Sequence, residues 1–290
     1  MAKNAGRHLR DTAVDGEAGG DLRCIAIDWS GARTRERDKL WLAEASAGRV
    51  VRLEGGTRTR AELVRHVVEL AEREPRLVVG LDFAFSFPAW FLAERGCRSA
   101  RELWARVAEE GERWLATCPH PFWGRPGRRK PALPAHHRKT ESDTPPVKGV
   151  GPKSVFQIGG AGAVGTGSVR GMPFLVELAS AGFAIWPFDA ARFPCAVEIY
   201  PRELTGPVQK SRSVGRRAWL ANRADDQDAE LVRRAATSED AFDAFASALA
   251  MSRHASELTR LAPARDAQER LEGRIWRPVR DPFGAEPCPD

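Results

Sequence analysis

The hydrophobic pattern begins with a short apolar run near the N-terminus. Cys24-Ile25-Ala26-Ile27 predicts a strand that ends at Asp28, and Trp29-Ser30-Gly31 after it is typical of a turn. Two further runs, 40–45 and 49–53, are separated by small residues and alternate well enough to predict an antiparallel hairpin. The chain is therefore expected to begin with three strands.

The next part of the chain predicts two helices and a strand that is apolar on both sides. Thr59 and Glu62 have the spacing of a capping box, and apolar residues recur after them at helical intervals. Leu77-Val78-Val79-Gly80-Leu81 is apolar at every position, which is typical of a central strand, and it ends at Asp82. Another helix is expected to begin after Ser99.

The last third of the chain predicts two helices and two more strands. The helices are expected at 172–181 and 238–251, and the strands at 183–186 and 196–200. Strands and helices in this order are typical of an α/β fold in which a mixed sheet carries helices on its faces.

A long segment without periodicity, Thr117 to Lys153, interrupts this order. It is rich in proline and is expected to be a loop or lid. Its basic residues, with Phe122 and Trp123 nearby, are suited to bind a phosphate backbone while rings stack on bases, although a solvated lid explains them equally well. The candidate nucleic-acid contacts are Arg125, Arg128, Arg129, Lys130, Arg138 and Lys139.

Composition is that of a globular protein, with 42% hydrophobic and 29% charged residues. The net charge of +6 suits a polyanionic partner, although a coding bias toward arginine explains it as well. The five cysteines include no C-x-x-C pair, which favours a reducing cytoplasm over a disulfide framework or a zinc site. Residues 1–21 and 281–290 are interpreted as tails, and we expect no membrane segment.

Two acids stand where apolar runs end. Asp28 and Asp82 each follow a predicted strand, where an unpaired carboxylate is costly to bury. If the second strand lies parallel beside the first, a right-handed crossover brings the two carboxylates onto adjacent strands. Two like charges at such a separation share a proton or bind a cation.

The last predicted helix carries two more acids. Asp240 and Asp243 are i, i+3 neighbours, and the alanines between and after them allow close approach to a sheet. Four oxygen donors without Cys or clustered His favour Mg²⁺ or Mn²⁺ over zinc. Glu198, inside the strand predicted at 196–200, is a fifth candidate.

Six motifs in order along the chain resemble one family. They are I-A-I-D-W-S-G-A, V-V-G-L-D-F-A-F-S-F-P, F-Q-I-G-G-A-G-A-V-G, W-P-F-D, V-E-I-Y-P and D-A-F-D-A. As a set they resemble the family known as domain of unknown function 429, whose members are predicted nucleases of the RNase H-like superfamily, close to the Holliday-junction resolvases. The resemblance runs from about Ile25 to Pro278.

The resemblance implies an RNase H-like mixed sheet of five or more strands with helices on both faces, formed by residues 22–280 with the loop at about 117–153 as an insertion. It matches Asp28 to the acid of the first strand and Asp82 to the acid that ends the fourth. Asp240 and Asp243 match the D-x-x-D pair of the last helix. In the resolvases the fourth-strand acid is commonly Glu, so the shorter Asp82 leaves its metal role open.

We therefore expect a metal-dependent nuclease, a hydrolase of phosphodiester bonds in DNA or RNA. Asp28 would bridge the metals, Asp82 and Asp243 would each hold one, and Asp240 or Glu198 would complete the shell or orient water. Junction cleavage would require a two-fold homodimer. Two other functions stay open, namely a non-catalytic module that binds nucleic acid or protein and a nucleotide-dependent phosphotransferase.

Three of these acids also have a structural explanation. Asp28 before Ser-Gly is suited to an Asx turn. Asp240 lies in a first helical turn, where the helix dipole favours acids. Glu198 would face water if its strand were an edge strand, and its even spacing from Ala196 and Tyr200 leaves its face undetermined.

Gly160, Gly162 and Gly165 form a literal G-x-G-x-x-G after an apolar run. A dinucleotide site would need this motif between a strand and a helix of a βα unit. The glycines continue through Gly167 and Gly171, which favours a close-packed segment whose amides approach phosphate.

Overall fold

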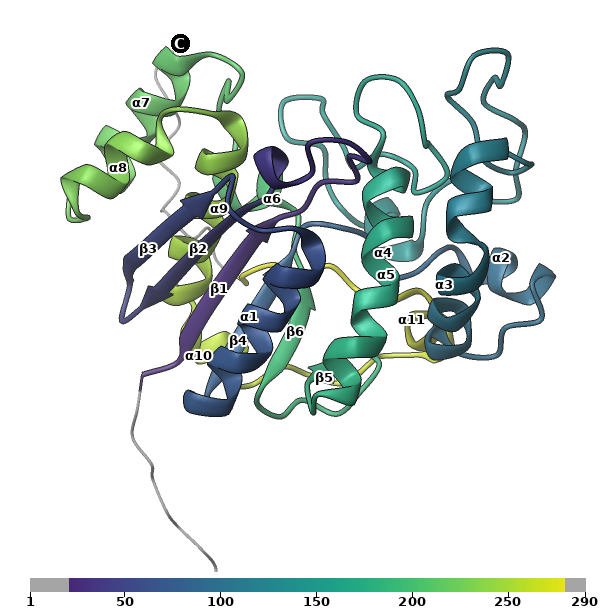
Figure 1. The fold of residues 1–290 in the computed structure, drawn as a ribbon, viewed down its shortest axis with the longest axis horizontal. Coiled ribbons are helices and arrows are strands. Elements are labelled where there is room, and N and C mark those ends of the chain that lie inside the picture. Colours follow the sequence, from purple (N-terminus) through teal and green to yellow (C-terminus); the bar gives the residue numbers. More distant parts are fainter. Residues whose placement is uncertain (1–20, 280–290) are drawn as a thin grey trace, which may run out of the picture.

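The computed structural model describes residues 21–279 (Figure 1), so the predicted tails 1–21 and 281–290 lie outside the described residues, apart from Asp21. A mixed sheet of six strands forms its centre, in the order β3-β2-β1-β4-β6-β5. The strands are β1 (Arg23–Asp28), β2 (Trp41–Ser46), β3 (Arg49–Gly55), β4 (Leu77–Leu81), β5 (Ala184–Ile185) and β6 (Cys195–Glu198). β1, β2 and β3 are antiparallel, whereas β1, β4, β6 and β5 are parallel. The predicted α/β class is confirmed.

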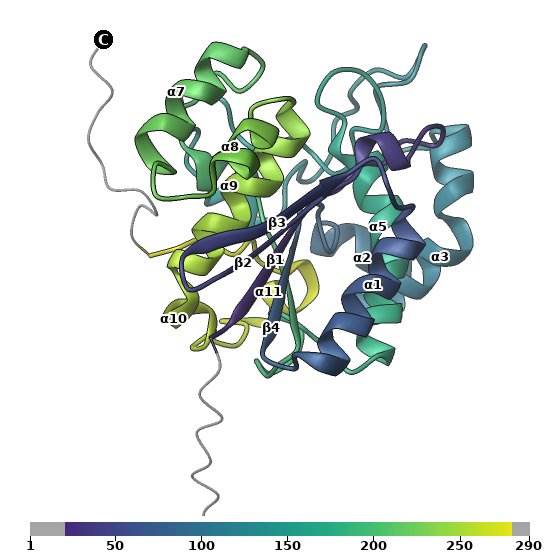
Figure 2. The same ribbon diagram turned by 60° about the vertical axis from the view of Figure 1, so that its left-hand side comes forward.

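Helices cover both faces of the sheet, as Figure 2 shows with the sheet between two groups of helices. One face carries α1 (Arg60–Arg73), α2 (Ala89–Glu94), α3 (Ala100–Thr117), α5 (Val164–Ser180) and α11 (Ala267–Glu272). The other carries α6 (Pro201–Thr205), α7 (Ser213–Arg223), α8 (Ala229–Ala235), α9 (Glu239–Arg253) and α10 (Ala255–Leu258). The one-turn helices η1 (Arg37–Lys39) and α4 (Lys139–Ser142) lie in connections.

Each face of the sheet has its own hydrophobic core because side chains alternate along a strand. In β1, Ile25 and Ile27 join the core under α1, α3 and α5, whereas Cys24 and Ala26 join the core under α9. The same alternation runs through β4 and β6. A residue's position in its strand therefore decides which group of helices it meets.

Three predicted helix starts are confirmed, whereas the helix predicted at 172–181 begins earlier, as α5 at Val164. Thr59 and Glu62 form a reciprocal capping box at α1. Ser99 and Ser238 accept hydrogen bonds from the third backbone N–H of α3 and α9, respectively. Such caps satisfy N–H groups that a helix leaves unpaired.

The segment 117–153 has little regular structure, as predicted, but it is not a solvated lid throughout. Phe122 is 3% exposed and packs against Trp114 of α3, and Arg138 is fully buried. The basic stretch between them is exposed. The segment is therefore anchored in the core at both ends of an exposed loop.

None of the helices between residues 21 and 279 combines the length and apolarity that a membrane crossing requires.

Candidate carboxylate site

A cleft of about 380 Å³ opens at the carboxyl ends of β1 and β4. Asp28, Asp82 and Asp240 line it, together with the turn after β1 and the first turn of α5. In open α/β sheets, the carboxyl ends of parallel strands are where ligands bind, because the loops diverge there. The cleft lies at the lower end of the size range of ligand sites, which is about 300–1,000 Å³.

Strand register brings Asp28 and Asp82 together. Ile27 pairs with Leu81 in the parallel ladder, and the backbone N–H of Asp82 donates to the carbonyl of Ile27 at 3.2 Å. The two acids therefore follow paired residues on adjacent strands, as predicted. Both have the same parity as the residues that face α9, so strand alternation directs both carboxylates toward that helix.

α9 brings the other two acids to the same end of the sheet. Its buried alanines, Ala241, Ala244 and Ala248, allow the helix to lie against β1 and β2. Asp243 is only 5% exposed, while Asp240 is half-buried and lines the cleft. The predicted convergence of two strands and a helix is present.

The carboxylates raise one another's pKa. Burial, followed by the charges of Asp243, Asp82 and Asp240, holds the pKa of Asp28 well above its usual range. Burial and the charge of Asp243 raise the pKa of Asp82 to about 7. Burial also raises the pKa of Asp243, against the opposing effect of Lys210. Such mutual effects require the acids to share one low-dielectric site.

Lys210, which lies between α6 and α7, belongs to the site although no sequence pattern predicts it. Its ammonium group forms an ion pair with Oδ2 of Asp243. Burial alone would lower the pKa of Lys210, but the charges of Asp243, Asp82 and Asp28 raise it. Oδ1 of Asp243 is buried and has no hydrogen-bond partner among the described residues. No motif surrounds Lys210, so its role emerges only from the tertiary structure.

Glu198 lines the same cleft from the opposite face of the sheet, and its charge adds to the raised pKa of Asp82. In β6, Cys195 and Val197 face α9, so Glu198 has the opposite parity and projects to the other face of the sheet. It is 3% exposed and accepts a hydrogen bond from the backbone N–H of Phe85 at 2.9 Å. The edge-strand explanation is wrong, because β6 lies between β4 and β5. A site role for Glu198 stays a prediction: the residue lines the cleft, and a guanidinium pairs with it.

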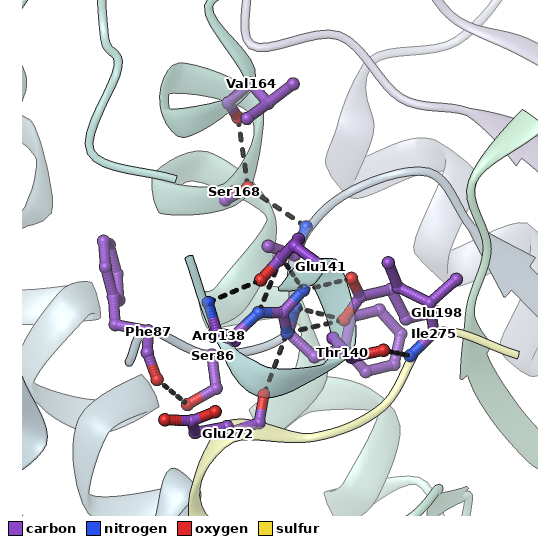
Figure 3. A network of polar contacts seen from close by, with 12 residues as sticks. Ser86, Phe87, Arg138, Thr140, Glu141, Val164, Ser168, Glu198, Glu272 and Ile275 are labelled. Carbon is purple, nitrogen blue, oxygen red and sulfur yellow. Dashed lines mark hydrogen bonds and ion pairs between the residues drawn. The ribbon is translucent and has the colours of Figure 1, made fainter. Parts of the chain in front are cut away.

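That guanidinium belongs to Arg138, which Figure 3 shows between Glu198 and Glu141. Nη1 of Arg138 donates to Glu198 and to the carbonyl of Glu272, both at 2.9 Å, and Nε donates to Glu141 at 2.8 Å. Arg138 is 0% exposed. The prediction that Arg138 contacts nucleic acid is therefore wrong, since no phosphate can reach it.

The other residues predicted to contact nucleic acid differ in their exposure to solvent and in their ion pairs. Arg125, Arg128, Arg129 and Lys130 are exposed. Lys139 forms an ion pair with Asp266 at 2.9 Å. Phe122 is buried, so its ring is not available to stack on a base, whereas Lys130 lies over the ring of the partly exposed Trp123 at 5.8 Å.

The glycine motif does not form a dinucleotide-binding turn. The apolar run before it makes an isolated bridge, Trp123 to Gln157, and adds no strand to the sheet. Gly165 instead packs closely, because a Cβ there would lie 2.1 Å from the carbonyl oxygen of Val155. Close packing is confirmed at Gly165, and the approach of the segment's amides to phosphate stays a prediction.

No three His, Cys, Asp or Glu side chains of residues 21–279 are already spaced as ligands of a metal ion. Five acids line the cleft, namely Asp28, Asp82, Glu141, Glu198 and Asp240. Arg138 forms ion pairs with Glu141 and Glu198, and Lys210 pairs with Asp243, so among the described residues Asp28, Asp82 and Asp240 are the lining acids without an ion-pair partner. The ligand atoms that these side chains offer are all carboxylate oxygens, which hard divalent ions such as Mg²⁺ prefer. The raised pKa values of Asp28 and Asp82 and the unpartnered Oδ1 of Asp243 also indicate missing positive charge.

No protein-family model, curated protein or solved structure matches the chain.

Proposed function

We propose that this protein is a divalent-metal-dependent nuclease that hydrolyses phosphodiester bonds in nucleic acid. The observation that carries the proposal is the convergence of Asp28 and Asp82, from adjacent parallel strands, with Asp240 and Asp243 of α9. A structural role explains a single buried acid, but not three, Asp28, Asp82 and Asp243, whose pKa values are raised by burial and by neighbouring acids.

The family resemblance and the fold support the same proposal. Domain of unknown function 429 and the RNase H-like superfamily imply acids on the first strand, at the end of the fourth and in the last helix. Asp28, Asp82 and the pair in α9 occupy the corresponding positions in the chain order of a mixed sheet. We propose on this basis that the fold is RNase H-like.

The residues of the cleft would act as follows. Asp28, Asp82 and Asp240 would hold Mg²⁺ or Mn²⁺ through their carboxylate oxygens. When bound, the ion would activate water and offset negative charge on the phosphate. Lys39 and Lys153 line the same cleft and would attract the phosphate backbone. The volume of about 380 Å³ suits a single nucleotide unit rather than an enclosed duplex.

Substitution of Asp28 by Asn tests the proposal. Asp28→Asn keeps the size of the side chain and removes its charge, so we expect Mn²⁺-dependent cleavage of single-stranded, duplex and junction DNA and of RNA to fall by about 10³-fold or more. Binding of the same nucleic acids should persist. Asp226→Asn, on the surface away from the cleft, is the control and should cleave as the wild type does. Absence of cleavage by the wild type with any substrate would contradict the proposal.

A second candidate is a non-catalytic binding module. The observation in its favour is Lys210, which already supplies one positive charge to the acids. In that case the wild type would bind nucleic acid equally well with Mn²⁺ or with a chelator, and there would be no cleavage for Asp28→Asn to abolish.

A further inference from the structure

Lys210 is held in place by the structure around it. Its side chain is 19% exposed, and its backbone carbonyl accepts a hydrogen bond from Nη1 of Arg216 at 2.5 Å. Arg216, itself 6% exposed, also donates through Nε to the carbonyl of Ala236 at 3.1 Å. The loop that carries Lys210 is thus tied to both α7 and the end of α8.

The first turn of α7 fixes the same loop from its other side. A Cβ on Gly215 would lie 2.5 Å from the carbonyl oxygen of Gln209, the residue before Lys210. Such an approach leaves little room for the backbone to shift. The ammonium group is therefore positioned by packing and not by a freely moving surface loop.

The charge of Lys210 acts on three acids of the site, although it contacts only one. Its ammonium group pairs with Asp243, and the charges of Asp82 and Asp28 also act on it. The paired carboxylate is incompletely satisfied, because Oδ1 of Asp243 is buried without a partner. A salt bridge that served packing alone would be expected to satisfy both oxygens.

We infer that Lys210 is a resident cation of the carboxylate site, takes the place of a second divalent ion, and limits the cleft to one ion held by Asp28, Asp82 and Asp240. This inference rests on the proposed function and revises one expectation from the sequence, namely that Asp243 holds a metal of its own. A lysine in this position supplies the positive charge that a second metal supplies in two-metal sites. One-metal hydrolysis follows for this chain.

The experiment counts Mn²⁺ ions bound to the full chain by electron paramagnetic resonance of free Mn²⁺, with thermal unfolding measured in the same samples. Lys210→Met removes the charge and keeps the length of the side chain, whereas Lys210→Arg keeps the charge. Lys153→Met is the control, because Lys153 lines the cleft and forms no ion pair with an acid among the described residues. The double variant Lys210→Met/Asp243→Asn removes both charges of the pair and guards against misfolding of the single variant.

We expect one ion in the wild type, Lys210→Arg and Lys153→Met. Lys210→Met should bind a second ion or bind the first about tenfold more tightly, and Mn²⁺ should raise its unfolding temperature more than that of the wild type. The double variant should bind one ion with an affinity within about threefold of the wild type, since Asp243 is not a ligand of that ion.

Two outcomes would overturn the inference while the proposed function stands. One is a wild type that binds one ion and a Lys210→Met variant with the same stoichiometry and affinity. The other is loss of all ion binding in the double variant, which would make Asp243 a ligand. If neither the wild type nor any variant binds Mn²⁺, both the inference and the metal-dependent function are wrong.

Discussion

Burial in the site destabilises the ionised carboxylate of Asp82. Its pKa is about 7 in the folded protein, against an ordinary value of 3.8, because burial and Asp243 disfavour its ionised form. Between these two values the folded protein binds more protons than the unfolded chain. The contribution of Asp82 to the free energy of unfolding is therefore most favourable at low pH and declines as pH rises toward 7.

Asp82→Asn should remove that dependence. In the presence of a chelator, the free energy of unfolding of the variant should exceed that of the wild type by about 2 kcal/mol above pH 7, and the difference should vanish below about pH 4. Urea denaturation across this pH range measures it. Asp266→Asn is the control of opposite sign, because the N–H of Glu269 and the charge of Lys139 lower the pKa of Asp266. An Asp82→Asn variant less stable than the wild type at pH 8 would contradict the account.

Single residues also mark the limit of sequence-based reasoning. Asp28 and Asp82 were predictable, because a polar residue at the end of a buried strand stands out against its apolar neighbours. The face of Glu198 was not, since the parity of β6 is defined only by its pairing with β4. Arg138 was wrongly predicted to contact nucleic acid, and Lys210 was not singled out. In both cases the sequence around a lone basic residue in a loop does not indicate that the residue is buried.

The connection between β6 and the loop 117–153 depends on Arg138. Its fully buried guanidinium joins Glu198 at the end of β6 to Glu141 in α4. Arg138→Met leaves two carboxylates buried without a counter-charge, so we expect a loss of about 3–5 kcal/mol in the free energy of unfolding. Denaturation in urea at pH 7 is the measurement, and Arg128→Met, an exposed residue of the same loop, should change stability by less than about 0.5 kcal/mol. Equal stabilities of the two variants would show that Arg138 does not hold the loop.

The contact between the turn after β1 and α5 requires glycine on one side only. A Cβ on Gly31 would lie 2.4 Å from the backbone nitrogen of Gly167, whereas a Cβ on Gly167 would meet no atom closer than 3.7 Å. Gly31→Ala should therefore destabilise the protein by about 1–3 kcal/mol and disturb the cleft. Gly167→Ala, inside a helix, should be neutral or stabilising by up to about 1 kcal/mol. Thermal unfolding of the pair decides whether this contact is as close as the structure has it.

Among the elements, those with strong local signals were predictable. The capping residues Thr59, Ser99 and Ser238 predicted the starts of α1, α3 and α9. The alternation of apolar and polar residues predicted the hairpin of β2 and β3. The short helices α6, α7 and α8 went unassigned. Helices of this length are marginal in isolation, so they depend on packing against their neighbours rather than on local pattern.

On the scale of the whole molecule, the basic loop is proposed to bind the phosphate backbone, and the acidic cleft is proposed to bind the metal ion. Arg125, Arg128 and Arg129 are exposed, and their charges oppose those of the cleft acids. If they bind phosphates, the triple substitution by Ala should weaken binding of any nucleic acid and reduce the dependence of log K on log salt by about 0.7–0.9 per lost contact. Fluorescence anisotropy over a salt series measures this slope. An unchanged slope would show that the loop does not contact the phosphate backbone.

Four acids from distant parts of the chain meet at one site, and the proposal is that three of them, Asp28, Asp82 and Asp240, bind one divalent ion there. Isothermal titration of the full chain with Mn²⁺ at pH 8, above the pKa of Asp82, tests it most directly. The account predicts saturable binding of about one equivalent, weakened at least about tenfold by Asp28→Asn and weakened again at pH 5.5, where protons compete for the carboxylates. Absence of saturable binding, or binding that Asp28→Asn leaves unchanged, would contradict it.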